Sequence, residues 1–404
     1  MDLGIERIEI LLLIAALVAI VTRRLKVPLS IGLVLAGIAL AFVPVTSNIT
    51  ITKDLIFTIF LPPLVYEAAL FIRWTELRRD LPVILSYATV GVLLSAAVTA
   101  AGMHLLVGWP WPSAILFGVL IAATDPVSVI AAFKEAGVRG RLRLLVEAES
   151  LFNDSTAAVA FGIALVFAMN EPVTVAGTLT TLLTTVGGGV LAGLTVGGLV
   201  LVVAGRTQDH LVEITLTTVA AYGSFFLAEH FHTSGVLAVL TAGLLTGNVG
   251  PLGAISDKGR EAVETFWEYV TFVVNSLIFI LIGIREAAQN FVVLLAPIGI
   301  AIVLVVGGRA LAIYPLSALF SRTRLRVSPS HQHILFWGGL RGALALALAL
   351  GLPAEIPLHD EIVTVAFAVV AFSLFVQGLT MIPLLRRLKE IPGSGPEQVS
   401  TEPH

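Results

Sequence analysis

The chain has 404 residues, of which 57% are hydrophobic and only 13% are charged, and its mean hydropathy is +0.97. Soluble domains carry roughly a quarter charged residues, so the composition excludes an ordinary water-soluble protein and predicts one folded in a lipid bilayer. The chain has no cysteine, which excludes disulfides, thiolate metal sites and haem attachment. Its formal net charge of -3 argues against a nucleic-acid partner.

Along the chain, about thirteen apolar runs are candidates for membrane-spanning helices, which need about 20 mostly apolar residues each. We therefore predict an all-α polytopic membrane protein with about 13 transmembrane helices. The runs lie near residues 8–22, 28–44, 55–72, 82–106, 112–133, 144–169, 175–204, 211–228, 234–249, 263–284, 291–320, 333–351 and 361–385.

The positions of lysine and arginine predict the orientation of the chain in the membrane. Of the 24 basic residues, nineteen fall in one set of alternate loops between the runs. Three fall in the opposite loops (Arg7, Lys53 and Arg285) and two lie inside runs (Arg309 and Arg341). Because cytoplasmic loops carry the excess of basic residues, we expect the N-terminus outside and the C-terminus in the cytoplasm.

The fifth run contains a carboxylate near its middle. Asp125 follows Thr124 and directly precedes Pro126. A charge inside a membrane span costs at least about 2.5–3.5 kcal/mol on insertion scales, so it marks a candidate functional site. Proline removes a backbone donor and disfavours helix at the preceding residue, so Asp125 is predicted to lie at an interruption of the helix.

The sixth run carries several polar side chains within one turn. Ser150 and Asp154 are i,i+4 neighbours on one helix face, and Asn153 lies beside them. Hydroxyl, amide and carboxylate oxygens are ligands of hard cations, and no His and Cys spacing typical of zinc or copper is present. These residues therefore predict a hard-cation site near the carboxylates.

Two further runs are interrupted. The third has Pro62 and Pro63 ahead of Glu67, and the twelfth has three glycines around Arg341. The fifth and twelfth runs are seven apart, an odd offset, so an internal repeat that relates them must be inverted in the membrane. Interrupted helices in corresponding halves indicate the midplane site of a transporter.

Several of these residues also have a structural interpretation. Arg341 needs a buried counter-charge, and Glu149 is the expected partner in a core ion pair. For Arg309, a second core cation and a helix-packing residue are equally open, and Glu147 lies close enough to the cytoplasmic end to be solvated. We assign no role to the histidines near predicted loops or helix ends: His104, His210, His230, His232, His331, His333 and His359.

Seven motifs follow one another over most of the chain. They are residues 61–70 (LPPLVYEAAL), 124–126 (TDP), 149–154 (ESLFND), 234–248 (SGVLAVLTAGLLTGN), 275–284 (NSLIFILIGI), 338–343 (GGLRGA) and 376–380 (VQGLT). This ordered set resembles the NhaP and NHE type of sodium/proton antiporters, within the monovalent cation/proton antiporters. One departure is Ser155, where relatives often have glycine, and it removes no expected ligand.

The resemblance implies an NhaA/NhaP-like antiporter fold, which is an inverted repeat with discontinuous crossing helices, acting as a homodimer. One transmembrane transporter unit would extend over residues 1–390, followed by a short disordered cytoplasmic tail at 391–404. The implied parts are dimerisation helices at roughly 1–81 and 211–290, core helices at roughly 82–170 and 291–390, and a linker helix at 175–204.

The resemblance also implies roles for single residues. Asn153 would organise the site, and Glu149 with Arg341 would form the core ion pair. Glu67 would be a shared ligand or a proton carrier. No cofactor is implied beyond the transported Na⁺ or Li⁺ and H⁺. The residues implied to bind sodium and exchange protons are Asp125, Asp154, Ser150, the Thr124 backbone and Glu67.

Together, the motifs predict a non-enzymatic antiporter of the cell membrane that exchanges Na⁺ for H⁺ by alternating access. Asn153 in place of a second aspartate leaves one fewer titrating group, which favours electroneutral 1:1 exchange. Exchange of K⁺ for H⁺ on the same fold stays open, because selectivity depends on cavity geometry. A cation channel is less favoured because no filter-like sequence is present, and an intramembrane protease because HExxH and GxSxG motifs are absent.

Overall fold

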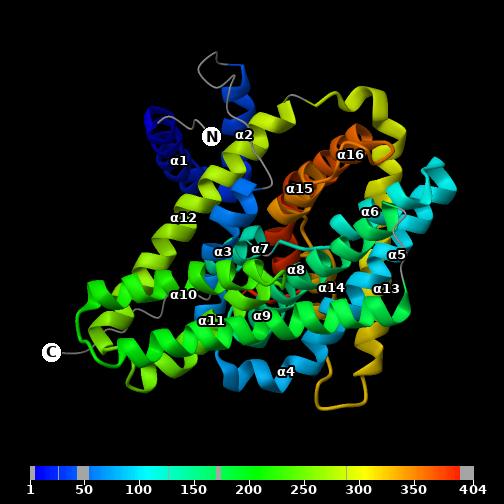
Figure 1. The fold of residues 1–404 in the computed structure, drawn as a ribbon. Helices are drawn as coiled ribbons and strands as arrows, with labels where there is room; N and C mark the ends of the chain where they lie inside the picture. Colours follow the sequence, from blue (N-terminus) through cyan, green and yellow to red (C-terminus); the bar gives the residue numbers. More distant parts are fainter. Residues whose placement is uncertain are drawn as a thin grey trace.

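The computed structural model is helical in every regular element of the residues that it describes (Figure 1). This confirms the predicted all-α class. Eight of the described helices are long and apolar enough to cross a membrane, and shorter apolar helices accompany them. The exact number of crossings and the internal repeat stay predictions. The described residues are 5–25, 27–42, 54–125, 127–169, 174–287 and 289–391, so most of the predicted tail at 391–404 lies outside them.

Most predicted runs coincide with helices to within a few residues, and the seventh matches α9 (Val175–Ala204) at both ends. The fourth run differs, because its helix begins at Trp74 rather than at residue 82. Asp80 in this added segment is 3% exposed, and its carboxylate accepts a hydrogen bond of 2.9 Å from Arg141 Nε. A charged segment whose buried Asp80 pairs with the partly exposed Arg141 therefore extends the helix beyond its apolar run.

One set of helices, which we name the first helix group, is formed by the beginning and the middle of the chain. Here α2 packs on α12, α11 packs on α3 and α9, and α10 packs on α9, α11 and α12. The elements of the first helix group are α1 (Ile5–Leu25), α2 (Leu29–Ala41), the π-helical η2 (Leu55–Phe60) with α3 (Leu61–Phe71), α9, α10 (His210–His230), α11 (Gly235–Val249) with η5 (Gly250–Leu252), and α12 (Asp257–Ala287).

The remaining helices form the second helix group. Here α6 packs on α5 and α8, and α13 packs on α5, α14 and α16. Its first half has α4 (Trp74–Ser86), η3 (Tyr87–Gly91), α5 (Val92–Gly102), η4 (Met103–Val107), α6 (Trp111–Leu120), α7 (Val127–Ala136) and α8 (Arg141–Ala168). Its second half has η6 (Phe291–Leu294), α13 (Leu295–Leu319), α14 (Pro329–Trp337), α15 (Ala343–Leu350), α16 (His359–Phe372), η7 (Ser373–Gly378) and α17 (Leu379–Arg387).

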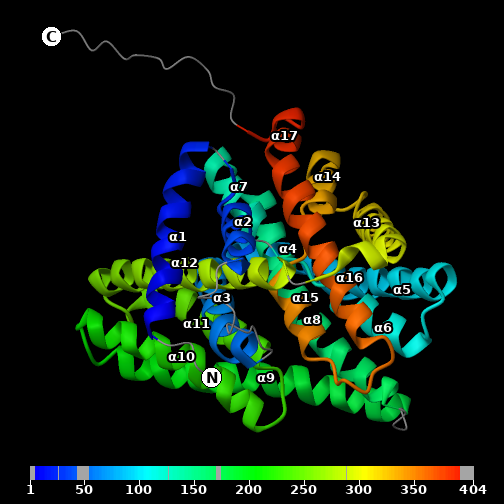
Figure 2. The same cartoon turned by 90° about the horizontal axis from the view of Figure 1, so that it is seen from above.

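Figure 2 shows the two groups side by side, with α1, α10 and α11 on one side and α5, α13 and α16 on the other. Within the first helix group, α2 and α12 meet at two glycines: a Cβ added to Gly37 would lie 3.0 Å from the Cα of Gly283. Small residues of this kind let helix backbones approach closely inside a membrane, where packing supplies much of the association energy.

Two helices of the second helix group are interrupted, as the sequence predicted. The first interruption follows α6, and residues 123–125 are not helical before α7 begins at Val127; Pro126 itself lies outside the described residues. The second interruption separates α14 from α15 at residues 338–342. Proline in the first and glycines in the second account for the loss of helix. We name these two segments the first and second breaks.

Candidate functional site

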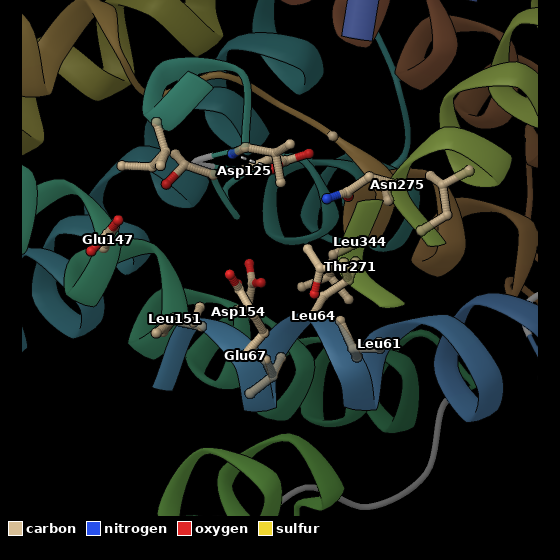
Figure 3. A pocket seen from close by; sticks show the side chains of 18 of the residues that line it. Leu61, Leu64, Glu67, Asp125, Glu147, Leu151, Asp154, Thr271, Asn275 and Leu344 are labelled. Atoms are coloured by element: carbon tan, nitrogen blue, oxygen red, sulfur yellow. Dashed lines mark hydrogen bonds between the residues drawn. The ribbon is translucent and has the colours of Figure 1, made fainter. Parts of the chain in front are cut away.

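A cavity of about 250 Å³ lies between the two helix groups, next to the first break. Four of the predicted ion-binding residues line it, namely Glu67, Thr124, Asp125 and Asp154. In Figure 3, Glu67 and Asp154 point into the cavity from one side, and Asp125 faces them from the other. The structure therefore brings together acids from three separate elements: α3, the first break and α8.

Asp125 is held at the meeting point of the two breaks. Its backbone N–H donates to the carbonyl of Leu340 in the second break at 2.7 Å, and its Oδ1 accepts from the N–H of Val127 at 2.9 Å. The second contact places the carboxylate at the N-terminus of α7, where the free N–H groups and the helix dipole favour negative charge. Backbone geometry thus fixes the position of the carboxylate.

Gly342, which precedes α15, allows the same carboxylate to approach the second break. A Cβ added there would lie 2.6 Å from Asp125 Cγ, and the Asp125 Oδ2 atom would be nearer still. Only glycine leaves this space, so the start of α15 also faces the Asp125 carboxylate. A second helix N-terminus therefore contributes positive potential to the site.

Helix α8 supplies the polar groups that hold the first break. Asn153 is fully buried, and its Oδ1 accepts from the Thr124 N–H at 3.1 Å while its Nδ2 donates to Thr124 Oγ1 at 2.6 Å. The Ser150 hydroxyl donates to the Thr124 carbonyl. These contacts satisfy backbone groups that the interrupted helix leaves without intrahelical partners. Thr124 lines the cavity, whereas the predicted ligand Ser150 is buried and contacts Thr124 without lining the cavity.

Neither Asp125 nor Asp154 has a lysine or arginine partner in any ion pair among the residues that the structure describes. A carboxylate removed from water must be paired, bind a metal ion or take up a proton. The two acids therefore require an external cation or protons for neutralisation. This arrangement suits the binding of a small hard cation by oxygen atoms.

The prediction that Glu149 pairs with Arg341 is wrong, because the basic partner of Glu149 is Arg309. Glu149 is 2% exposed, and its two carboxylate oxygens accept hydrogen bonds of 2.8 and 2.9 Å from the two terminal nitrogens of Arg309. Asn153 Nδ2 donates to the same carboxylate at 3.0 Å. The residue that the sequence left between two interpretations, Arg309 on α13, is therefore the core cation of this pair.

Arg341 instead binds the carbonyl groups at the end of α6. Its side chain is 1% exposed, and it donates to the carbonyl oxygens of Ala122 at 2.7 Å and Ala123 at 3.0 Å. A cation at a helix C-terminus is stabilised by the dipole and by the unpaired carbonyls. Its backbone N–H is fixed by Ser373 Oγ at 2.8 Å, which itself donates to Gln377.

Arg309 caps backbone carbonyls near the end of α14, as Arg341 does at the end of α6. Besides binding Glu149, it donates from two nitrogens to the carbonyl of Leu335, at 3.3 and 3.0 Å. Gly339 makes room for the guanidinium, because a Cβ there would meet Arg309 Nε at 2.6 Å. At each break, a buried arginine from another segment therefore binds backbone carbonyls at the C-terminal end of the preceding helix.

The structure adds residues to which the sequence gave no role. Thr271 and Asn275 of α12 line the cavity, together with Lys134 at the end of α7. Glu147 lines it as well, and its Oε1 accepts from Arg143 Nε at 2.7 Å, so Glu147 is not simply solvated. A signal was available for Thr271 and Asn275, because they are polar residues at i,i+4 in an apolar run.

No histidine lines this cavity within the described part of the chain. Two histidines make contacts near the first turns of α14. His331 lies 3.6 Å from Glu390, and His333 is hydrogen-bonded to the hydroxyl of Tyr314 at 2.8 Å.

Comparisons with known proteins match nearly the whole chain to one family. The family described as "Sodium/hydrogen exchanger, transmembrane" matches residues 11–387. The chain is 39% identical over 369 residues to the Na(+)/H(+) antiporter ApNhaP of Aphanothece halophytica, covering 90% of this chain and 70% of the relative. It is 35% identical over 400 residues to the Na(+)/H(+) antiporter NhaH of Halobacillus dabanensis, covering 94% and 97%.

The fold is similar to a solved structure of the sodium proton antiporter MjNhaP1 from Methanocaldococcus jannaschii at pH 8. The TM-score is 0.77, the match covers 95% of this chain and 98% of the other, and the sequence identity is 20%. The likeness shows that the two chains share a fold.

Proposed function

Because the chain belongs to the transmembrane sodium/hydrogen exchanger family, we propose that it exchanges Na⁺ for H⁺ across a membrane at Asp125 and Asp154. One observation supports this most strongly: two acids that form no ion pair with a lysine or arginine among the described residues share a cavity in a membrane protein, beside an interrupted helix. Charged groups inside membrane proteins mark ion pathways, and interrupted helices mark transporter sites.

In the proposed bound state, Na⁺ is held by oxygen atoms from both sides of the cavity. The carboxylates of Asp125 and Asp154 supply the charge, and the Ser150 hydroxyl and the Thr124 carbonyl supply neutral oxygens. Glu67 completes the set as a shared ligand or as the proton carrier. Hydroxyl, carbonyl and carboxylate oxygens are the ligand types that hard cations prefer.

Exchange follows if Na⁺ and H⁺ compete for the same carboxylates. Either load lowers the negative charge of the site by one, whereas an empty site with both carboxylates ionised is more costly to carry across the apolar barrier. Lowering the pH should therefore raise the apparent KM for Na⁺ on the acidified side, because more of the site is protonated. A KM that stays constant from acid to alkaline pH would contradict competition at a shared carboxylate.

We further propose that the second helix group is the core that moves and that the first helix group mediates homodimerisation. The ion-binding acids Asp125 and Asp154 belong to the second helix group, and Glu67 belongs to the first. Asn153 is a neutral amide that donates to Glu149 and accepts from Thr124, so it adds no titrating group next to Asp154. This favours a 1:1 electroneutral exchange.

Reconstituted protein tests the proposal. Purified protein is placed in liposomes that contain a pH dye under an imposed pH gradient, and Na⁺, Li⁺ or K⁺ is added. Sodium should collapse the gradient in the wild type with no dependence on a clamped membrane potential. Asp154→Asn and Asp125→Asn should abolish exchange, while Glu76→Gln, at an exposed acid paired with Arg73, should retain it.

The same assay separates the alternative functions. A K⁺ response larger than the Na⁺ response would make the protein a K⁺/H⁺ antiporter that uses the same acids. Cation flux without proton movement would indicate a channel. If no cation moved protons in the wild type under any condition, the proposed exchange would be overturned.

A further inference from the structure

Helix α12 presents a polar stripe to the cavity. Glu268, Thr271 and Asn275 follow one another at spacings of three and four residues, so they share one helix face. Apart from Ser276, the residues around them are apolar, from Phe272, Val273 and Val274 to the Leu and Ile residues that follow. Polar groups in an otherwise apolar span require partners, because water is excluded from the surrounding lipid.

The hydroxyl of Thr271 lacks such a partner. Its Oγ1 atom is buried and has no hydrogen bond within the described residues. Other threonines in the chain's helices bond to their own backbone: Thr241 donates to the Leu237 carbonyl at 2.7 Å, and Thr246 donates to the Ala242 carbonyl at 2.8 Å. Thr271 differs from them, because it lines the cavity and its hydroxyl does not bond to the helix backbone.

A second cavity, of about 270 Å³, adjoins the first at these residues. Both cavities are lined by Glu67, Thr271 and Asn275, and the second is also lined by Glu268. In Figure 3, Thr271 and Asn275 lie across the cavity from Glu147, and Glu67 lies near Asp154. The shared lining therefore combines a hydroxyl, an amide and a carboxylate with the ammonium group of Lys134, where the second cavity meets the cavity that Asp154 lines.

We propose that Thr271 and Asn275, with Glu67, form an outer subsite that holds Na⁺ before it reaches Asp125 and Asp154. The inference rests on the proposed function and extends it. A hydroxyl oxygen, an amide oxygen and a carboxylate match the ligand preference of a hard monovalent cation. Water molecules in the two cavities complete the coordination of a partly hydrated ion.

The position of the subsite decides what it controls. Thr271 and Asn275 belong to the first helix group, whereas Asp125 and Asp154 belong to the second. If the second helix group carries the ion across, the oxygens of α12 stay behind. They therefore govern loading of the cation from the cavity side and its discrimination from other cations, and they do not take part in the crossing itself.

The test removes the polar atoms of one side chain at a time. Thr271→Val removes the hydroxyl, and Asn275→Leu removes the amide. In proteoliposomes, each change should raise the apparent KM for Na⁺ about three- to tenfold, the order expected for one lost contact to a charged group that water partly replaces. The maximal rate at saturating Na⁺ should stay near the wild-type value.

Thr241→Val is the matched control, because it is the same chemical change on α11 at a hydroxyl bonded to its own helix. It should leave the KM unchanged. Equilibrium binding of radioactive Na⁺ to purified protein supplies a second readout, in which Thr271→Val and Asn275→Leu should bind more weakly than the wild type and Thr241→Val. The ratio of Li⁺ to Na⁺ affinity should also shift in the first two variants only.

The outcomes separate this inference from the proposed function. If wild type exchanges Na⁺ and Asp154→Asn does not, but Thr271→Val and Asn275→Leu match the control in KM, binding and cation ratio, the subsite is refuted and the exchange stands. A fall in maximal rate with unchanged KM would also overturn the subsite. If the wild type moves no protons, the proposed function itself has failed.

Discussion

The two breaks interrupt helices in the same way but present opposite charges. The first break, before α7, carries the acid Asp125, and the second, between α14 and α15, carries the base Arg341. Among the described residues Asp125 makes no ion pair with a base, while Arg341 donates from one terminal nitrogen to the carbonyls of Ala122 and Ala123. One break therefore leaves its charge available to an ion, and the other uses its charge to hold the structure.

The comparison explains how a charged site is kept rigid without being neutralised by the protein. Arg341 donates hydrogen bonds to the backbone carbonyls that follow α6, and Arg309 donates to a backbone carbonyl of α14. With both helix ends held by fixed cations, Asp125 can be positioned by backbone N–H groups alone. Neutralisation is then left to the transported ion or to protons.

The largest effect is expected from breaking the ion pair that holds α14. Glu149→Gln leaves Arg309 buried without its counter-charge, and breaking a buried pair costs about 3–5 kcal/mol. Thermal unfolding in detergent should show a clear drop in Tm. In a double-mutant cycle, Glu149 should be coupled more strongly to Arg309 than to Arg341. Equal or stronger coupling to Arg341 would contradict the observed pairing.

A smaller loss is expected at the second break itself. Arg341→Met keeps the side-chain volume but leaves the buried carbonyls of Ala122 and Ala123 without donors, at about 1–3 kcal/mol for an unmade buried hydrogen bond. Exchange should fall together with Tm. Arg341→Lys should recover part of both, because an ammonium supplies the charge without the planar fork. Unchanged stability in Arg341→Met would remove the capping role.

The closest approach of the two breaks can be probed by one methyl group. Gly342→Ala places a Cβ against the Asp125 carboxylate. We expect about a tenfold rise in the apparent KM for Na⁺, equal to about 1.4 kcal/mol. Gly307→Ala is the control, because a Cβ there meets nothing within 4 Å. The same KM for Na⁺ in both variants would mean that Gly342 does not lie against the Asp125 carboxylate at the ion site.

The smallest effect is expected at Ser155, which follows Asp154 on α8. Ser155 is 3% exposed and its hydroxyl has no partner among the described residues. Ser155→Ala should leave the KM for Na⁺ unchanged and alter stability by no more than about 1 kcal/mol, since removing an unpaired buried hydroxyl costs little. A changed cation ranking would instead make Ser155 part of the site.

Local sequence patterns were sufficient to predict the positions of most helices and of both breaks. Apolar runs specify which segments enter the bilayer, and the residues at the breaks act on their own backbone, so neither requires knowledge of distant contacts. The gathering of Asp125 with Ser150 and Asn153 also followed from matching motifs.

Pairings between distant residues could not be obtained in this way. Two arginines in apolar runs, Arg309 and Arg341, were possible partners of Glu149. Only the packing of α13 places Arg309 against Glu149, while Arg341 binds the carbonyls at the end of α6. Thr271 was given no role, because the sequence does not show whether its hydroxyl bonds to its own helix backbone or lines a cavity. Its free hydroxyl becomes visible only when the cavity is described.

The central claim is that Na⁺ and protons share the carboxylates at the first break. Calorimetric titration of purified protein with Na⁺, in two buffers of different ionisation enthalpy, counts the protons released on binding. We predict about one proton released per Na⁺ bound at a pH where the site is protonated, and no Na⁺-linked release in Asp154→Asn. Sodium binding without proton release in the wild type, at every pH tested, would contradict the account.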